Sequence, residues 1–430
     1  MDKKLHLNRI TLLLYIYKMK YTYTILLCIC CSLLFAQGKN GYLQNNRFNL
    51  NELDFKFPQN DFNIIGFGAY HGSSKTYDAE YALLNSLKSQ NLLDYYIPET
   101  NYSQAFFFDQ YLQNGDEELL RDLVLSYQNI VSQEGTIETF NHWKRIRKLN
   151  LDTQSKEIKV IGFDIMNEYK YPIKHILYLT ESTSDWNQRN NLEQLIQNED
   201  IDISPSNKEV KIILKNFITD YELNKRIYSQ YTTDTVSLNH IIKNISYTLK
   251  DKIEREVVIF ENYKELSESL DLKNKRQFAK YGFFHIQKER EKNYPSFFTR
   301  LIEQNVYPKE NIISIIGYLT NSEVLWDKVY DKNGNYISYT TEKGFGIGDY
   351  WKEYFKGIKY LKKSKVSDIT LFRLNNEESP YNSRADLIEV KYFMKKGNKK
   401  YLKNKSTLDF IDYAILISDS KNQIPIEEFK

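Results

Sequence analysis

Short apolar runs bounded by polar residues recur along the chain and predict buried β-strands. They are Asn63–Tyr70, Tyr95–Glu99, Lys159–Ile165, Asn311–Tyr318, Asp368–Leu374 and Tyr413–Ser418. Between the early runs, apolar residues recur with helical spacing in Asp78–Ser89, Gln104–Gln113 and Glu117–Tyr127. Alternating strands and helices are typical of an α/β fold, so we expect a central, largely parallel sheet flanked by helices.

The middle of the chain has a different pattern. From about Ser184 to Asn305 there is little strand signal, and charged segments with helical periodicity, such as Lys208–Tyr228 and Leu238–Leu270, fill the region. We therefore expect residues 184–305 to form a helical insertion that covers one edge of the sheet, within one α/β domain of residues 37–430.

The N-terminus has the order of a secretory signal peptide. Lys18 and Lys20 precede an apolar run, Ile25–Phe35, which ends at Ala36-Gln37. The run is too short for a spanning helix, so we expect cleavage after residue 36, no membrane span in the mature chain, and a periplasmic or secreted protein. An uncleaved membrane anchor is the alternative interpretation.

Removing that segment changes the composition of the chain. All three cysteines lie within it, so the mature chain would have no disulfide, thiolate metal site or cysteine nucleophile. Residues 1–36 hold five basic residues and one acidic, so the formal charge falls from +3 by 4 to −1. A nearly neutral chain does not predict a nucleic-acid partner. The basic stretch Lys395–Lys405 is interpreted as a solvated loop.

The most distinctive local feature is Gly66-Phe-Gly-Ala-Tyr-His71-Gly72, where an apolar strand runs into a glycine-flanked histidine. Ligands bind at the carboxyl ends of strands in open α/β sheets, and imidazole is the natural general base near neutral pH. A structural histidine in a tight turn is the alternative.

Two acids share this placement. Glu99 ends the next apolar run and Asp164 ends the one after it, so His71, Glu99 and Asp164 follow three successive strands. A carboxylate can orient an imidazole and raise its basicity, and we therefore treat all three as candidate catalytic residues. Capping or solvated acids are the alternative for the carboxylates, and the same three residue types could also bind a metal.

Three further residues are candidates for supporting roles. Arg147, in a basic and aromatic segment upstream of Asp164, could stabilise an oxyanion or bind a substrate carboxylate, or only pack its helix. Tyr318, at the end of an apolar run, is a candidate substrate-binding residue. His285 lies within the expected helical insertion. A lone histidine on an apolar helix face is more often structural than catalytic.

In order along the chain, these elements resemble the erythromycin esterase-like family. Gly68-Ala-Tyr-His71-Gly72 and Ile97-Pro-Glu99 resemble its histidine strand and the glutamate of its next strand, and Gly162-Phe163-Asp164 resembles its Gly-Phe-Asp element. Ile146-Arg147-Lys-Leu-Asn150, Gly346-Ile-Gly348-Asp-Tyr350 and Asp412–Ile417 resemble three others. The resemblance spans roughly residues 63–418.

The resemblance implies an exported hydrolase without a cofactor, in which a histidine activates water to attack a small-molecule ester or lactone. Two family features are absent: the glutamate of Gly-Glu-x-x-His, in whose place Gly68 stands three residues before His71, and the late His-Asn-x-His element, which we expect on Ile312–Asn321 and do not find there. We therefore expect His285 to complete the site as a catalytic residue.

A Gly-x-x-His turn also resembles haem-uptake lipoproteins of the ChaN type and metal-dependent proteases of the TIKI/TraB type. Gly68-Ala-Tyr-His71 fits their short motif as well. A periplasmic haem- or ligand-binding protein and a metallopeptidase are therefore the alternative functions, and the sequence leaves the oligomeric state open.

Overall fold

The computed structural model describes residues 38–128, 131–152, 155–183, 186–198, 201–250, 254–343 and 348–428. The expected signal peptide therefore lies outside the described residues. Within these ranges, no helix combines the length and the apolar character needed to cross a membrane.

An eight-stranded sheet forms the centre of the molecule, in the order β1-β11-β13-β6-β2-β5-β3-β4. The six strands from β13 to β4 run parallel to one another. At one edge of the sheet, β11 pairs antiparallel with β13, and β1 pairs antiparallel with β11. The strands are β1 (Arg47–Asn49), β2 (Ile64–Gly68), β3 (Tyr95–Ile97), β4 (Lys159–Val160), β5 (Gln277–Tyr281), β6 (Ile312–Thr320), β11 (Ile369–Arg373) and β13 (Tyr413–Ser418). The expected α/β class with a largely parallel sheet is confirmed.

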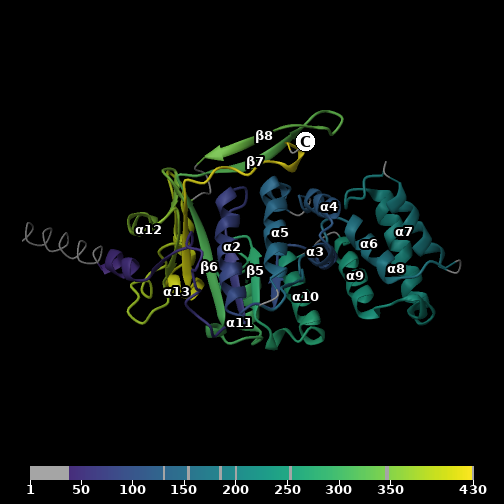
Figure 1. Cartoon of the computed structure of the whole chain (residues 1–430), viewed down its shortest axis with the longest axis horizontal. Coiled ribbons are helices and arrows are strands. Elements are labelled where there is room, and N and C mark those ends of the chain that lie inside the picture. Colours follow the sequence, from purple (N-terminus) through teal and green to yellow (C-terminus); the bar gives the residue numbers. More distant parts are fainter. Residues whose placement is uncertain are drawn as a thin grey trace, which may run out of the picture.

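Helices cover both faces of this sheet (Figure 1), which is why its strands are apolar on both sides. Along β2, Ile65 and Phe67 join the core of one face and Ile64 joins the core of the other. The first face packs against α2 (Ser74–Ser89), α3 (Tyr102–Asn114), α4 (Glu117–Tyr127) and α5 (Ile137–Asn150). The second packs against α10 (Arg255–Ser269), α11 (Phe297–Glu303), α12 (Ile358–Ser364) and α13 (Thr407–Phe410).

A helical lobe stands beside the sheet with a hydrophobic core of its own, to the right in Figure 1. It consists of α6 (Lys170–Leu179), α7 (Asn187–Gln197), α8 (Lys208–Tyr228) and α9 (Thr235–Thr248). Trp186 is fully buried at its centre and stacks on Tyr228 with ring centroids 4.1 Å apart. The lobe thus begins before the expected boundary at Ser184 and ends well before Asn305.

The remainder of the expected insertion belongs to the sheet. After the lobe, α10 returns to the sheet face, and β5 then pairs in parallel with both β2 and β3. The sequence interpretation missed this strand because Gln277 and Lys280 interrupt its apolar pattern. Both side chains are nevertheless buried.

Two smaller sheets follow β6. The hairpin β7 (Glu323–Tyr330) and β8 (Tyr336–Lys343) extends across the top of the molecule in Figure 1. The strands β9 (Asp349–Tyr350), β10 (Glu353–Phe355) and β12 (Val390–Tyr392) form a separate antiparallel sheet.

Candidate active site

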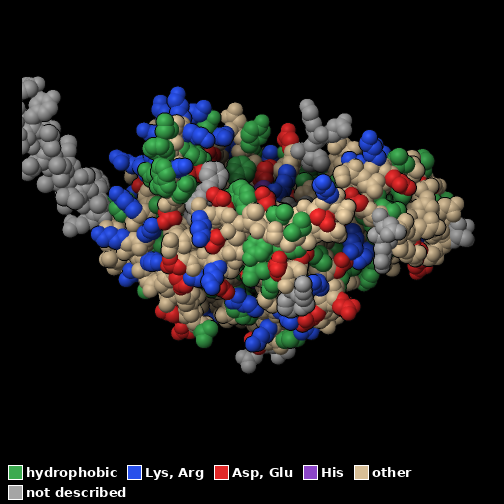
Figure 2. Space-filling model, turned by 90° about the horizontal axis from the view of Figure 1, so that it is seen from above, with side chains coloured by type: hydrophobic (Ala, Val, Ile, Leu, Met, Phe, Trp, Pro, Cys, Tyr) green, Lys and Arg blue, Asp and Glu red, His purple; other side chains and the backbone are tan. Residues whose placement is uncertain are grey.

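Three neighbouring strands bring the candidate catalytic residues together. The order β2-β5-β3 places Gly68 beside Tyr281 and Ile97 beside Ala279, so the residues that follow these strands meet at one edge. They supply His71 after β2, Glu99 after β3 and His285 after β5. Figure 2 views the molecule from above and shows a hollow near the middle of this face, with acidic and basic side chains around it.

His71 is fixed by the turn that follows β2. Gly72 has φ +85°, and a Cβ there would come within 2.5 Å of the Leu325 carbonyl oxygen, so only glycine fits. The Nδ1 atom of His71 lies 2.8 Å from Glu134 Oε1. Because a carboxylate only accepts, Nδ1 carries the proton and Nε2 remains free to accept one. That Nε2 lies 3.5 Å from Glu99 Oε2, and the side chain is 21% exposed.

Glu99 is the buried centre of the site. One of its oxygens accepts a hydrogen bond of 2.8 Å from the Gly282 backbone N–H, and the other accepts one of 2.6 Å from Arg255. Burial would raise the pKa of Glu99, but the charges of His71, His285 and Arg255 outweigh it and lower the pKa to about 2. Glu99 is therefore a carboxylate at neutral pH.

Asp164 holds Arg255 in place. The guanidinium donates to its two carboxylate oxygens, from Nη2 at 2.5 Å and from Nε at 2.8 Å, in a bidentate pair. Burial would lower the pKa of Arg255, but Asp164 and Glu99 raise it. Asp164 thus acts on the site through Arg255, which bridges it to Glu99.

His285 faces Glu99 from the side opposite His71. Its Nε2 lies 3.6 Å from Glu99 Oε1, and its Nδ1 lies 2.5 Å from Glu256 Oε1. Although burial lowers the pKa of His285, the hydrogen bond to Glu256 and the charge of Glu99 raise it above its ordinary value. His285 was expected within a helical insertion, but it lies in the turn that follows β5, because the chain there has returned to the sheet.

Gly282 leaves open space between these groups. A Cβ at this position would lie 3.4 Å from His285 Cδ2, 3.6 Å from His71 Nε2 and 3.8 Å from Glu99 Oε2. The three functional side chains therefore border one small volume, and a reacting group placed there would contact all of them.

A buried ionic cluster underlies His71. Tyr77 donates a hydrogen bond to Glu134, while Glu80 accepts one of 2.5 Å from Tyr96 and lies 3.2 Å from His142. Lys280 of β5 lines an enclosed cavity of about 10 Å³ together with His71 and Glu134. Burial would raise the pKa of Glu80 and of Glu134. Interactions with His142 lower the pKa of Glu80, the hydrogen bond with His71 lowers that of Glu134, and the charge of Lys280 lowers both. The cluster thus keeps the partner of His71 ionised.

Two candidate residues lie elsewhere. The guanidinium of Arg147 packs against Gly115, at the end of α3 that is remote from the strand ends. The guanidinium of the site is Arg255 instead. The hydroxyl of Tyr318 donates to the Leu387 carbonyl at 2.7 Å, although the ring lines a cavity of about 180 Å³ next to the site.

Sequence reasoning missed Glu134, Arg255, Glu256 and Lys280. Arg255 and Glu256 open a helix in a charged region, where such residues are usually solvated. Only Lys280 carried a signal, as a charged residue in an otherwise strand-compatible segment. As for metals, no three His, Cys, Asp or Glu side chains among the described residues are arranged so that they could hold one ion.

The structure is thus that of an α/β protein with a histidine–carboxylate cluster at the carboxyl ends of its parallel strands. No protein-family profile matches the sequence, and no curated protein matches it either.

Solved structures identify the fold more closely. A protein from Bacillus cereus has a TM-score of 0.59 and 16% identity over 91% of this chain and 99% of its own. A succinoglycan biosynthesis protein has a TM-score of 0.57 and 14% identity, covering 90% and 98% of the two chains. A variant of an erythromycin esterase in its open conformation has a TM-score of 0.56 and 11% identity, covering 84% and 92%. The chain therefore shares the fold of an erythromycin esterase.

Proposed function

We propose that the protein is a hydrolase in which His71 activates a water molecule for attack on an ester or lactone. The observation that carries this proposal is the arrangement of two histidine–carboxylate pairs, His71–Glu134 and His285–Glu256, on either side of the ionised Glu99. Hydrolysis needs a base for water and an acid for the leaving group. The pair His71–Glu134 supplies the base in this proposal, and the pair His285–Glu256 supplies the acid.

His71 is the base in this mechanism. Glu134 holds its Nδ1–H, so Nε2 accepts the proton of a water lying in the space over Gly282. Glu134 stabilises the imidazolium that forms, as a buried carboxylate does in other histidine-based hydrolases. Glu99 accepts the second proton of the same water in a hydrogen bond and so orients the attacking oxygen.

His285 is the acid. Because Glu256 and Glu99 raise its pKa, the protonated imidazolium is favoured, and its Nε2 faces the same space as His71. It therefore donates to the carbonyl oxygen or to the leaving alcohol. Arg255 is a positioning residue, because it reaches the site only by holding Glu99.

The position of His285 also accounts for a family feature absent from β6. The turn after β5 reads Gly282-Phe-Phe-His285, which has the spacing of His-Asn-x-His with glycine in the first place. His285 thus stands at the end of a strand, in the place of the second histidine of that element. The glycine enlarges the pocket where a first histidine would stand.

The test is hydrolysis of p-nitrophenyl acetate and of a macrolide lactone by the purified chain. We expect His285→Ala to lower kcat by on the order of 10²-fold, the usual contribution of an acid–base group. Activity should survive a metal chelator, and the Soret band of added haem should not shift when the protein is present. Unchanged kinetics in His285→Ala would contradict the mechanism. Loss of activity with chelator would favour the metallopeptidase, and a protein-dependent shift of the Soret band would favour the haem-binding protein.

We propose further that the protein is exported and cleaved near Ala36, because a basic segment and a short apolar run precede Ala36-Gln37. N-terminal sequencing of the protein recovered from the periplasm or medium is expected to begin near Gln37. Translation could start at Met1 or at Met19, and recovery of a chain that still begins at either methionine would contradict cleavage.

A further inference from the structure

A group of exposed apolar side chains lies on the small sheet β9-β10-β12, away from the active site. Met394 is 89% exposed, Trp351 is 61% exposed and Phe393 is 56% exposed. The rings of Trp351 and Phe393 are 5.3 Å apart, and the Phe393 backbone N–H bonds to the Lys352 carbonyl at 2.7 Å. We call Trp351, Phe393 and Met394 the apolar tip.

The backbone at the apolar tip favours this exposure. Met394 has φ +61°, a left-handed conformation that is uncommon for a residue with a side chain. The turn after β12 thus projects Met394 outward instead of folding it back onto the sheet. Large apolar side chains gathered at one exposed point mark an interaction site more often than scattered ones do.

Lysines follow the apolar tip in the sequence. Residues 391–405 contain seven lysines and no acidic residue. A surface cavity of about 1130 Å³ that begins at Tyr392, next to the tip, is lined by these lysines, together with Lys356, Arg384 and Glu389. Lys396, Lys399 and Lys403 are exposed and form no ion pair with any side chain of the described chain. Their positive charge is therefore available to an anionic partner.

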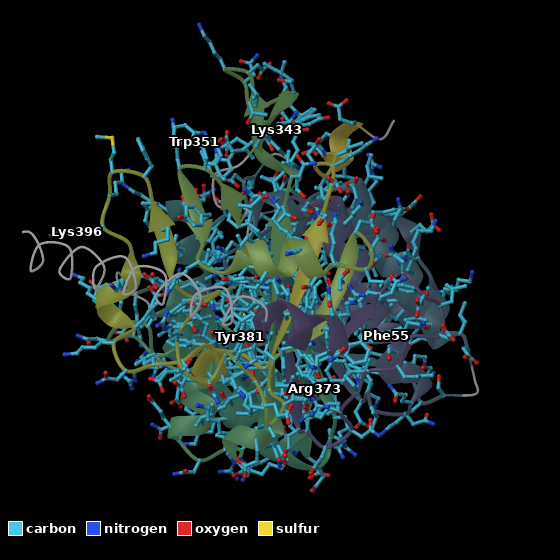
Figure 3. All side chains as sticks on the ribbon, turned by 90° about the vertical axis from the view of Figure 1, so that its left-hand side faces the viewer. Phe55, Lys343, Trp351, Arg373, Tyr381 and Lys396 are labelled. Carbon is cyan, nitrogen blue, oxygen red and sulfur yellow. The ribbon has the colours of Figure 1, made fainter. Side chains whose placement is uncertain are left out.

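The same side of the molecule is where the chain enters the described fold. Lys39 forms an ion pair with Asp386, which also pairs with Lys356 at the edge of the basic cavity. Figure 3 looks at this end of the molecule and labels Trp351 and Lys396 on it.

We propose that the apolar tip and its lysines dock the folded domain onto the surface of an anionic phospholipid bilayer. Tryptophan and phenylalanine are well suited to the interfacial region, where the ring enters the acyl boundary. The lysines beside them would lie at headgroup level, where anionic lipids attract them. A soluble polyanion would account for the lysines but not for the three exposed apolar side chains beside them.

The experiment is cosedimentation with phosphatidylcholine vesicles, with and without added phosphatidylglycerol. All three described hydrophobic cores lie within residues 43–426, so the chain is used from Gln37 onward, which also removes the apolar run. We expect binding only to the anionic vesicles, and weaker binding at high salt.

Two variants test the lysines and the apolar tip separately. Replacing Lys395, Lys396, Lys399 and Lys400 by Gln should weaken binding about 600-fold, at about fivefold per lysine. Replacing the three residues of the apolar tip by Ala should weaken it about tenfold or more.

Matched controls come from α8, at the opposite end of the molecule in Figure 1. One control replaces Lys208, Lys211, Lys215 and Lys225 by Gln. The other replaces the exposed Ile212, Leu223 and Ile227 by Ala. Both should leave vesicle binding unchanged.

Several results would overturn the proposal. They are equal binding to neutral and anionic vesicles, binding to neither, or equal losses in the tip and control variants. Retention on heparin without vesicle binding would assign the lysines to a soluble polyanion. A solution dimer that the tip variant converts to a monomer would make the apolar tip a subunit interface.

Discussion

The active site and the helical lobe each bury a histidine, and they shift its pKa in opposite directions. His175 on α6 is 1% exposed and stacks on Phe106 with ring centroids 3.9 Å apart. Burial lowers the pKa of His175 to about 3, so the imidazole is neutral at physiological pH. His285 is also largely buried, yet the pKa of His285 is raised, because Glu256 and Glu99 outweigh the effect of burial.

The difference shows that the placing of carboxylates, and not burial, separates a candidate acid from a packing residue. In the lobe the neutral ring of His175 packs in the way that an apolar aromatic side chain would. At the strand ends every histidine has a carboxylate on each side. Each prediction below sets a residue of the site against a matched residue outside it.

The largest effect is expected for His71. Replacing it by Ala removes the side chain that takes a proton from water over Gly282 in the proposed mechanism. We expect kcat for ester hydrolysis to fall by about 10²–10⁴-fold, with KM nearly unchanged. His175→Phe, the control in the lobe, should keep kcat within about twofold. Equal losses in the two variants would place the chemistry elsewhere.

Arg255 and Arg147 form the second pair. Arg255→Met leaves Glu99 and Asp164 buried without their cation and should lower the free energy of unfolding by about 3–5 kcal/mol. Arg147→Met removes a half-buried guanidinium that packs against Gly115, and the loss should be smaller. Urea unfolding at pH 7 measures both. A larger loss in Arg147→Met would show that Arg255 is not the main support of the acid cluster.

The third prediction concerns the stability of the lobe. Because the pKa of folded His175 lies near 3, the unfolded chain binds the extra proton first as the pH falls below 6.5. His175 therefore contributes a loss of stability between pH 6.5 and 3. His175→Phe should gain about 2 kcal/mol over the natural chain at pH 5 relative to pH 8, from 1.5 pH units at about 1.36 kcal/mol each. Parallel stability curves from pH 8 to 4 would contradict this.

The smallest effect is expected for Glu256→Gln, which leaves His285 in place but removes a carboxylate. The raised pKa of His285 contributes stability that is complete below pH 6.5 and is lost as the pH rises through the folded pKa. Without Glu256 the pKa of His285 falls, so the alkaline limb of the kcat–pH profile should move down by about one pH unit.

Glu265→Gln is its control, because Glu265 lies 3.2 Å from His240 of the lobe in a similar pair. That variant should leave the kcat–pH profile unchanged. If both variants shift the limb, or neither does, His285 is not the acid.

Much of the fold followed from hydrophobic patterning. All six expected strands are present, because strands buried on both faces are continuous apolar runs that stand out from their surroundings. β5 was missed because it contains Lys280, which is stable inside the sheet since it lines a buried cavity together with Glu99 and Glu134. The hairpin β7-β8 was missed because half of its side chains are exposed and its apolar run is limited to Val324–Trp326.

The site was only half predictable for a related reason. His71 and Glu99 follow strands, and strand ends can be located from periodicity. Glu134 comes from a short 3-10 helix and Glu256 from the first turn of α10, each far from its histidine in the sequence. Nothing local distinguishes them from solvated acids, since only the tertiary fold buries them.

The position of β5 determines when the protein can finish folding. β2 and β3 are consecutive in the sequence but do not pair with each other, because β5 lies between them. Helices α2 to α5 and the whole lobe therefore lie in the sequence between β2 and the strand that joins the two halves of the sheet. Such non-local pairing slows folding and leaves strand edges open to aggregation in the meantime. Since Gly282 and His285 follow β5, we expect the pocket to form only once β5 has paired, and a chain stalled before that step to lack the site.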